Sequence, residues 1–337
     1  MGSEKDVSSG NKPLQSTIST LRGAQEQPFS RATKGLVWVG LPSIVIGVWV
    51  LSPLTASLIP VLLLPTFSLV WWDRAQPANQ RTDIETFIWT YVLTGTLGTV
   101  VCIVGQAVLS YGLMMVLFQD DTEKVFAEVQ RNEADIALMD EEALATRRQM
   151  AASWQNWIFI FASAFSVAGA VEEWMKYTAL TLARRYGRIV HERNYITLAA
   201  AGAIGFGTFE GLGFIYAATR ATPGPGALTL TIAERIIIGP PTHAIGAVLI
   251  GLNTALRDFH GQPLGIAKII GLPIFFHGLH DFSLFAFSAL DGNVGWIHPY
   301  GKKLLLVYAV VLTVQGGMIS HVRHRLSKHT FAKGNQN

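Results

Sequence analysis

Long uncharged apolar runs constrain this chain more than any other feature of its sequence. An α-helix needs about 20 mostly apolar residues to cross the hydrocarbon core of a bilayer. We identify eight such runs, at approximately 35–52, 54–72, 86–118, 154–182, 195–219, 227–256, 264–290 and 302–320. Only 15% of the 337 residues are charged, against about 25% in an average soluble domain. The sequence therefore predicts an all-α fold, a polytopic integral membrane helical bundle with about eight transmembrane helices.

The runs divide the chain into five segments. They are a polar tail at 1–34, three amino-terminal transmembrane helices at 35–120, a charged inter-span helical segment at 121–152, a membrane core at 153–290, and the last transmembrane helix with a basic tail at 291–337. The segment at 121–152 is rich in Asp, Glu and Arg. It is expected to be a surface helix or helical hairpin, or else a solvated connector between two spans.

The positions of Lys and Arg predict how the chain is oriented. Cytoplasmic loops carry an excess of these residues, and the densest loop cluster is Arg184, Arg185, Arg188 and Arg193. Counted over all loops, the excess places both termini in the cytosol, in a multi-pass protein of an unspecified membrane. The single cysteine, Cys102, excludes an intramolecular disulfide. The net charge is only +3 and no basic stretch alternates with aromatic residues, so the expected partner is the lipid bilayer, with no nucleic acid.

Four consecutive apolar runs carry ionisable side chains. They include Glu172, Glu173 and Lys176 in the fourth run, Glu210 in the fifth, Arg235 and His243 in the sixth, and His277, His280 and Asp281 in the seventh. Each charge at the centre of a bilayer costs about 2.5–3.5 kcal/mol on insertion scales. A set of such groups in neighbouring spans needs mutual compensation. The sequence therefore predicts one polar cavity that the four spans share.

Residue spacing predicts which of these groups meet. Glu172 and Lys176 are four residues apart, a spacing that favours a local ion pair on one helix face. Glu173 is turned by about 100° from Glu172, so we expect Glu173 to be the carboxylate left for chemistry. His277 and Asp281 are again four apart, which predicts that Asp281 orients His277. Arg235 is expected to extend to the outer membrane interface.

Helix breaks and small residues are expected around two of the site residues. The Gly-Pro-Pro sequence at 239–241 directly precedes His243. Proline removes an amide donor and breaks or kinks a helix, and such backbone is tolerated in a membrane where protein or water satisfies it. Glu210 lies among four glycines between 205 and 213. Small residues let neighbouring helices approach closely around that carboxylate.

The residue types point to acid–base chemistry in an apolar setting. A carboxyl group in a low-dielectric site can act near neutral pH as general base or acid. Histidines can donate to a developing oxyanion. Carboxylate oxygen and imidazole nitrogen are also zinc ligands, although the sequence contains no His-Glu-x-x-His motif. These groups suffice to activate water for attack on an amide carbonyl without a Ser or Cys nucleophile.

The ordered motifs resemble a known family. Glu-Glu-x-x-Lys at 172–176, Phe-x-x-x-Glu at 206–210, His243 and His-x-x-x-Asp at 277–281 look like the signature of the PrsW-type intramembrane proteases. That family is related to the type II CAAX prenyl endopeptidases and the Abi proteins. The resemblance covers about residues 165–290, so the segment 153–290 would be a PrsW-like catalytic membrane core.

The resemblance implies a role for each matching residue. The catalytic set would be Glu172, Glu173, Glu210, His243 and His277, with Lys176, Phe206, His280 and Asp281 in support. One of the paired glutamates would activate water. No cofactor is certain from the sequence. If a divalent metal such as zinc is present, Glu210, His243 and His277 would hold it.

The leading functional hypothesis is an intramembrane endopeptidase. It would hydrolyse a peptide bond of a membrane protein or of a lipidated peptide, using a glutamate-activated water with histidine support. Two alternatives remain open from the sequence. The pocket could isomerise or cyclise an apolar small molecule, or the chain could be a non-catalytic transporter or scaffold with a protease-like fold.

Overall fold

The computed structural model describes residues 29–220, 225–297 and 301–328. Within these ranges every regular element is a helix. The chain divides into residues 1–42 and residues 43–337. The described residues of the first part are helical from Arg31 onward, with α2 (Arg31–Gly35), the π-helical segment η2 (Leu36–Gly40) and the first residues of α3 (Leu41–Leu51). Ser30 caps α2 by accepting a hydrogen bond from the Thr33 amide at 3.2 Å.

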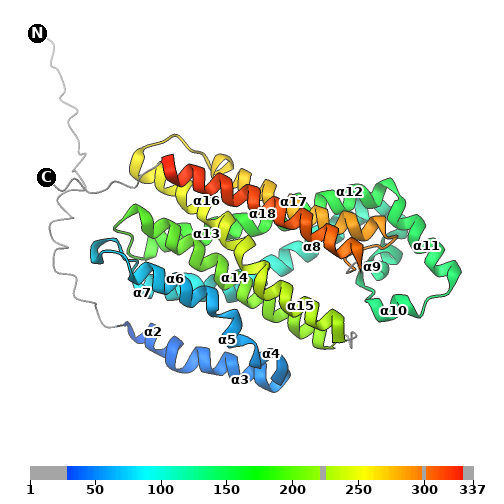
Figure 1. The fold of residues 1–337 in the computed structure, drawn as a ribbon, viewed down its shortest axis with the longest axis horizontal. Helices are drawn as coiled ribbons and strands as arrows, with labels where there is room; N and C mark the ends of the chain where they lie inside the picture. Colours follow the sequence, from blue (N-terminus) through cyan, green and yellow to red (C-terminus); the bar gives the residue numbers. More distant parts are fainter. Residues whose placement is uncertain (1–28, 221–224, 298–300, 329–337) are drawn as a thin grey trace, which may run out of the picture. The chain divides into compact units, whose positions relative to one another are not determined.

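The second part holds the remaining helices, whose order follows the colours of Figure 1. They are α4 (Pro53–Ser57), α5 (Ile59–Leu62), α6 (Leu64–Arg74), η3 (Ala78–Gln80), α7 (Ile84–Leu93), η4 (Thr94–Gly98), α8 (Thr99–Phe118), η5 (Gln119–Asp121), α9 (Thr122–Gln130), α10 (Glu133–Ala137), α11 (Glu141–Ala152), α12 (Trp154–Ala162), η6 (Ser163–Gly169), α13 (Ala170–Tyr186), α14 (Glu192–Arg220), α15 (Pro225–Ile237), α16 (Gly239–His260), α17 (Ile266–Leu290) and α18 (Lys302–Lys328).

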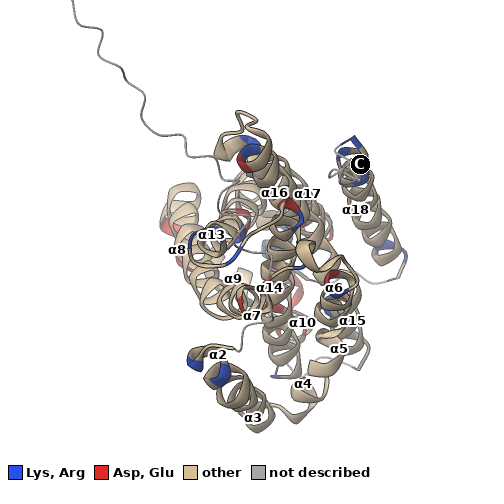
Figure 2. Cartoon of the chain, turned by 90° about the vertical axis from the view of Figure 1, so that its left-hand side faces the viewer, with Lys and Arg blue, Asp and Glu red and all other residues tan. Residues whose placement is uncertain are grey.

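Seven helical stretches within the described residues are long and apolar enough to cross a membrane. They are Arg31–Leu51, Ala78–Gln130, Trp154–Tyr186, Glu192–Arg220, Leu228–His260, Ile266–Leu290 and Lys302–Lys328. Figure 2 shows that charged residues are sparse along most of the helices. The polytopic helical bundle expected from the sequence is therefore confirmed.

The expected span at 54–72 is not one of these seven stretches. In its place the chain forms α4, α5 and α6, which begin and end at short intervals. Pro60 and Pro65 each lie in the first turn of one of these helices. A proline lacks the amide donor that a continuing helix needs. The apolar run is long enough to cross a bilayer, but its prolines divide it into short helices, so the described residues contain seven candidate spans where the sequence predicted about eight.

Helix α14 forms the centre of the second part. Its residues are largely buried, and it packs against α16 and α7. Gly205 lies so close to α7 that an added Cβ would come within 2.2 Å of the Tyr91 carbonyl oxygen. On the other side, a Cβ at Gly251 of α16 would lie 2.7 Å from the Tyr195 carbonyl oxygen. Glycine at these two positions lets three helices approach closely, as in other membrane bundles.

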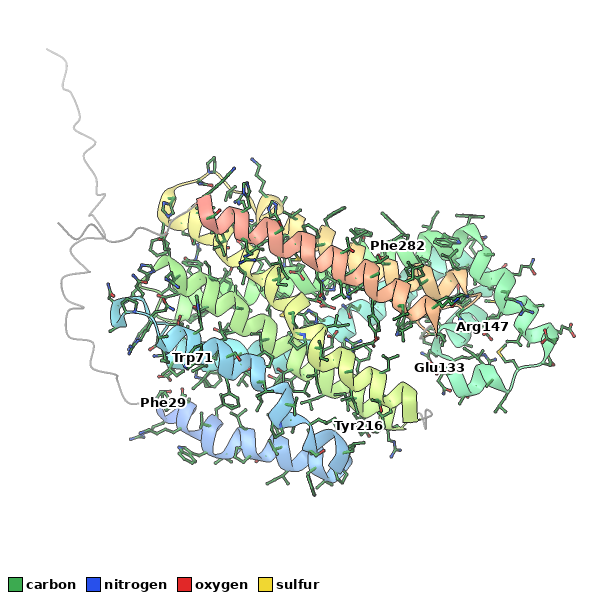
Figure 3. All side chains as sticks on the ribbon, viewed as in Figure 1. Phe29, Trp71, Glu133, Arg147, Tyr216 and Phe282 are labelled. Atoms are coloured by element: carbon green, nitrogen blue, oxygen red, sulfur yellow. The ribbon has the colours of Figure 1, made fainter. Side chains whose placement is uncertain are left out.

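The charged segment at 121–152 forms three short helices, α9 to α11. Arg147 of α11 is 1% exposed and donates to a Glu128 carboxylate oxygen at 2.6 Å and to the Val294 carbonyl oxygen at 2.7 Å. Val125 and Ala151 are buried in one cluster with Val294. Arg147 is labelled in Figure 3. The buried ion pair thus joins α9 to α11, and the carbonyl contact and apolar packing attach the segment to the loop after α17.

Candidate active site

The helix break expected before His243 is present. Helix α15 ends at Ile237 and α16 begins at Gly239, with prolines in its first turn. The amides of a first turn have no partner inside the helix, so proline costs little there. Because α16 starts anew at this point, His243 lies within its first two turns and is 7% exposed. The break therefore brings the imidazole to the inside of the bundle.

A π-helical segment precedes the paired glutamates. η6 (Ser163–Gly169) runs without interruption into α13, whose third and fourth residues are Glu172 and Glu173. Such wider turns occur often at functional sites. η6 packs against α17, the helix that carries His277. This contact holds α13 and α17 at the separation that the carboxylates and the imidazole need.

Glu173 is paired through Oε1, while its buried Oε2 has no hydrogen-bond partner among the described residues. Its Oε1 accepts from Lys176 Nζ at 2.6 Å and from His277 Nδ1 at 2.8 Å, and the residue is 2% exposed. The local ion pair expected between Glu172 and Lys176 is present but long, with 4.0 Å between Glu172 Oε2 and Lys176 Nζ. Both spacings place side chains on one helix face. Lys176 thus forms its hydrogen bond with Glu173, three residues before it, and not with Glu172, four residues before it.

Glu172 is held differently. Its Oε1 accepts from Gln106 Nε2 of α8 at 3.0 Å. Its Oε2 is buried and has no hydrogen-bond partner among the described residues. Three nitrogens surround Oε2 beyond bonding distance, namely His277 Nε2 at 3.6 Å, His243 Nδ1 at 3.8 Å and Lys176 Nζ at 4.0 Å. This oxygen is therefore free to accept from a water molecule.

His243 links two charged groups. Lys176 Nζ lies 3.1 Å from His243 Nδ1, and Glu210 Oε2 lies 3.1 Å from His243 Nε2. An ammonium can only donate and a carboxylate can only accept. We therefore assign the tautomer with the proton on Nε2, which donates to Glu210. Phe206 packs edge-on against the His243 ring, with 5.2 Å between ring centroids, so it limits the orientations of the ring.

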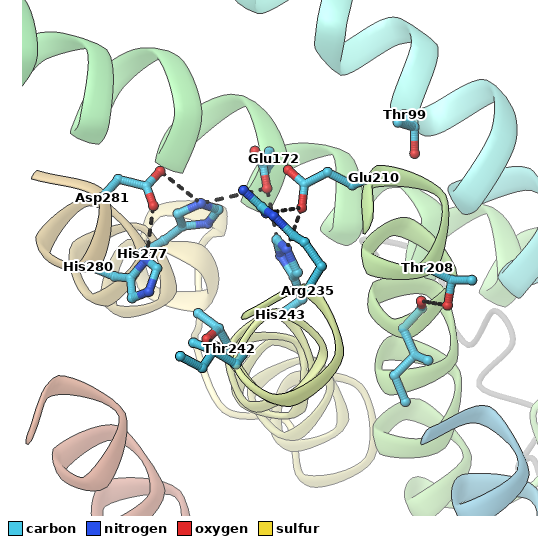
Figure 4. Close-up of polar contacts among 12 residues, drawn as sticks. Thr99, Glu172, Thr208, Glu210, Arg235, Thr242, His243, His277, His280 and Asp281 are labelled. Atoms are coloured by element: carbon cyan, nitrogen blue, oxygen red, sulfur yellow. Dashed lines mark hydrogen bonds and ion pairs between the residues drawn. The ribbon is translucent and has the colours of Figure 1, made fainter. Parts of the chain in front are cut away.

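Arg235 belongs to the site, contrary to the expectation that it reaches the interface. Its NH1 lies 3.4 Å from Glu210 Oε2. The guanidinium carbon stands 3.5 Å above the centre of the Phe214 ring, a cation–π contact. Figure 4 shows Arg235 directed toward Glu210 and His243. The carboxylate and the ring together hold the guanidinium inside the bundle.

His277 is oriented by carboxylates on both sides. Its Nδ1 donates to Glu173, and its Nε2 faces Asp281 Oδ2 at 3.4 Å. Asp281 Oδ1 in turn contacts His280 Nδ1 at 3.0 Å. Figure 4 shows this chain from α17 reaching toward Glu172. The spacing of 277 and 281 thus brings Asp281 beside His277, as expected.

Two hollows flank the paired glutamates. A cavity of about 10 Å³, the room of a single water, is lined by Glu173, Thr242, His277 and Gln315 among others. Gln315 of α18 donates to Thr242 across it. A second hollow is an open apolar groove of about 470 Å³ between α8 and α13.

The donor atoms of Glu172, Glu210 and His243 fit a metal ion. One ligand atom from each lies within 4.8 Å of the other two. Carboxylate oxygen with imidazole nitrogen suits zinc, and Glu172 Oε2 is a buried acceptor without a partner. His277, expected as a ligand from the sequence, is not in this group. Glu172 takes its place.

The charge of the site also fits a divalent cation. Four carboxylates, those of Glu172, Glu173, Glu210 and Asp281, face the two permanent cations Lys176 and Arg235. When all four carboxyl groups are ionised, two negative charges remain. Uncompensated charge is costly in a bilayer. One divalent cation, or two protonated histidines, would balance the cluster.

One contributor to the site lies outside the predicted set, and another was expected elsewhere. Gln106 was not predicted, because the site was built from ionisable side chains and Gln106 carries no charge. The amide in the middle of the run VVCIVGQAVLS could have indicated a contact with the site, since a polar side chain in an apolar span needs a hydrogen-bond partner. Arg235 was seen but assigned to the interface. Sequence periodicity could not show that Phe214 and Glu210 flank it.

Comparison with known proteins gives one match. A family model described as PrsW family intramembrane metalloprotease matches residues 85–315. The matched region begins in α7 and ends in α18, so it includes every residue of the site described above. Searches of curated proteins and of solved structures give no match.

Proposed function

This chain belongs to the PrsW family of intramembrane metalloproteases, and from that premise we propose that it hydrolyses a peptide bond of a membrane protein, with Glu172 as the residue that activates water. One observation carries the assignment. Glu172 Oε2 is buried, has no hydrogen-bond partner among the described residues and lies amid three nitrogens at 3.6–4.0 Å. Glu173, which the spacing had favoured, also has a buried Oε2 without a hydrogen-bond partner among the described residues, but its Oε1 is already bonded to Lys176 and His277.

The chemistry follows from these positions. Glu172 accepts a proton from the water, and the water oxygen attacks the carbonyl carbon of the scissile bond. Negative charge develops on the carbonyl oxygen. In its imidazolium form His277 donates through Nδ1 to Glu173 and through Nε2, which lies 3.6 Å from Glu172 Oε2, toward the carbonyl oxygen. The proton on Glu172 then passes to the leaving nitrogen as the carbon–nitrogen bond breaks. Glu173 and Asp281 keep the His277 ring in one orientation throughout the reaction.

A divalent metal ion has a place in this proposal. Held by Glu172, Glu210 and His243, it would act as a Lewis acid on the carbonyl oxygen and make water more acidic. Lys176 and Arg235 would still neutralise Glu173 and Glu210. Glu172 takes part in either form, as proton acceptor or as ligand, so substitution of Glu172 tests both. We propose zinc as the ion, because the donors are two oxygens and one nitrogen.

The groove between α8 and α13 supports a substrate within the bilayer. Its lining includes Val101, Cys102, Val171 and Trp174, and Val171 directly precedes Glu172. An apolar groove beside the reactive carboxylate suits an apolar segment that stays in the membrane. A lipidated peptide is the second candidate substrate, because its acyl or prenyl chain is apolar and would also fit the apolar groove.

Substitution of Glu172 tests the proposed function. We compare cells that produce the wild-type chain with cells that produce Glu172→Gln, and map new amino termini of membrane proteins by mass spectrometry. We expect cleavages that depend on Glu172. With a fluorogenic peptide carrying the mapped sequence, purified Glu172→Gln should lose about 100- to 10,000-fold in kcat, the range for a general base.

The matched control is Glu192→Gln. Glu192 is also a buried glutamate bonded to a histidine, His260, at 2.6 Å, but it starts α14 away from the site. We expect this variant to cleave as the wild type does. Wild-type activity of purified Glu172→Gln would refute the assignment. Identical sets of amino termini in both cell lines would refute the proteolytic function itself.

A further inference from the structure

Gln106 is a lone amide in the middle of an apolar helix. It belongs to α8 (Thr99–Phe118), and the residues before it, from Val100 to Gly105, carry no charge. Burying an amide in an apolar medium is unfavourable unless it forms a hydrogen bond. The partner that Gln106 finds is Glu172 Oε1, at 3.0 Å on another span. The contact therefore joins α8 to the reactive carboxylate.

The contact gives the two oxygens of Glu172 different surroundings. Oε1 is occupied by the Gln106 amide, while Oε2 has no partner among the described residues. Oε2 lies 3.6 Å from His277 Nε2 and 4.0 Å from Lys176 Nζ. A hydrogen-bonded pair has a separation of roughly 2.7–3.2 Å. A shift of about 1 Å would therefore turn Glu172 into a second direct partner of Lys176 or His277.

We propose that Gln106 is a positioning residue, which holds Glu172 away from those two nitrogens so that Oε2 stays available to water. Gln106 acts through Glu172 and does not touch the reacting atoms. Glu173 provides the contrast within the same helix. No glutamine holds it, and it lies in direct contact with both Lys176 and His277. The inference rests on the proposed function, because it assigns the support of the same water-activating carboxylate.

Two variants of nearly the same size test the role of the amide. Gln106→Met keeps the length of the side chain and removes the donor. Gln106→Glu keeps the shape and, when ionised, can only accept, so it faces Glu172 with like charge. With the fluorogenic peptide of the previous section, we expect Gln106→Met to lose about 10- to 100-fold in kcat, as outer-shell partners do. Gln106→Glu should lose more, and KM should change in neither variant.

The control is Thr96→Val in η4, the segment that leads into α8. The Thr96 hydroxyl donates to the Val92 carbonyl oxygen of its own helix at 2.7 Å, so the change removes a polar group without touching the site. We expect wild-type kcat and KM. Thermal unfolding in detergent is measured for all variants, so that a loss of folded protein is not mistaken for a loss of kcat.

Three results would overturn the inference. Wild-type kcat in Gln106→Met, while Glu172→Gln is inactive, would show that Glu172 needs no tether. Equal losses in the Met and Glu variants with a raised KM would assign Gln106 to packing against substrate. Wild-type activity of Glu172→Gln would overturn this inference together with the proposed function, which separates the two failures.

Discussion

Two adjacent glutamates have different partners at this site. Glu173 shares Oε1 between Lys176 and His277, while Glu172 Oε1 accepts from Gln106. The Oε2 atoms of both have no hydrogen-bond partner among the described residues. The turn of about 100° between successive helical residues predicts that their partners differ. It does not predict which one receives the lysine. That choice depends on the positions of α16 and α17, which lie beside Glu173.

Removal of metal is a test at the scale of single residues. The cluster carries two more carboxylates than permanent cations, and three ligand atoms lie within 4.8 Å. We expect 1,10-phenanthroline to lower cleavage of the fluorogenic peptide by more than about 100-fold, since a Lewis acid contributes several kcal/mol. Added zinc should restore it. Elemental analysis should find bound metal in the wild type and its loss in His243→Ala.

The control for metal binding is His260→Ala. His260 is paired with Glu192 outside the site, so this variant should keep both metal and activity. Full cleavage by metal-free protein would contradict the expectation. In that case the two remaining negative charges would be balanced by protons instead of a metal ion.

At the scale of helices, glycine and proline decide where elements approach and where they end. Pro60 and Pro65 divide an apolar run into short helices, and the prolines after Gly239 restart a helix in front of His243. Gly205 brings α14 against α7. The same two residue types thus account for the division of that apolar run and for the placement of a site histidine.

Substitution of Gly205 tests the close contact of α14. In Gly205→Ala the added Cβ would meet the Tyr91 carbonyl oxygen at 2.2 Å, so one helix must move. We expect a loss of about 1–3 kcal/mol in the free energy of unfolding, the usual range for overpacking. Thermal or denaturant unfolding in detergent measures it.

Gly213→Ala is the matched control on the same helix. A Cβ at Gly213 meets nothing within 4 Å, and alanine favours a helix over glycine by up to about 1 kcal/mol. We expect unchanged or slightly raised stability. Equal effects of the two substitutions would contradict the close contact between α14 and α7.

At the scale of the whole molecule, the site is assembled from spans far apart in the sequence. Gln106, Glu172, Glu210, His243 and His277 come from α8, α13, α14, α16 and α17. The order of these helices and the match over residues 85–315 agree with one catalytic core. The tail before that region and the helices α2 to α6 lie outside the match.

The orientation of the chain in the membrane is a prediction at this scale. Arg184, Arg185, Arg188 and Arg193 favour a cytosolic position for the loop at 187–191 and for both termini. Two variants are made in a Cys102→Ser background, so that each has a single thiol. Val190→Cys places it at an exposed position between α13 and α14, and Leu138→Cys at an exposed position between α10 and α11. In sealed vesicles of known orientation, a membrane-impermeant maleimide should label Val190→Cys from the cytosolic face and Leu138→Cys from the opposite face. The reverse pattern would invert the topology.

The sequence by itself determined the class of fold and most members of the site. Apolar runs of about 20 residues admit few folds other than a helical membrane bundle. Ionisable side chains in such runs are costly enough that they must meet, so Glu172, Glu173, Glu210, His243 and His277 could be grouped without a structure. Composition and spacing carry this information because it depends on the bilayer and on the helix period alone.

Only the tertiary structure decided the pairing within that group. Lys176 forms a hydrogen bond with Glu173, and Arg235 forms one with Glu210. Gln106, which is not among the predicted site residues, donates to Glu172. Each of these contacts depends on how far neighbouring helices are rotated and how closely they approach. Helix periodicity predicts the face on which a side chain lies. Its partner belongs to another helix, and residue spacing within one helix does not determine where that other helix lies.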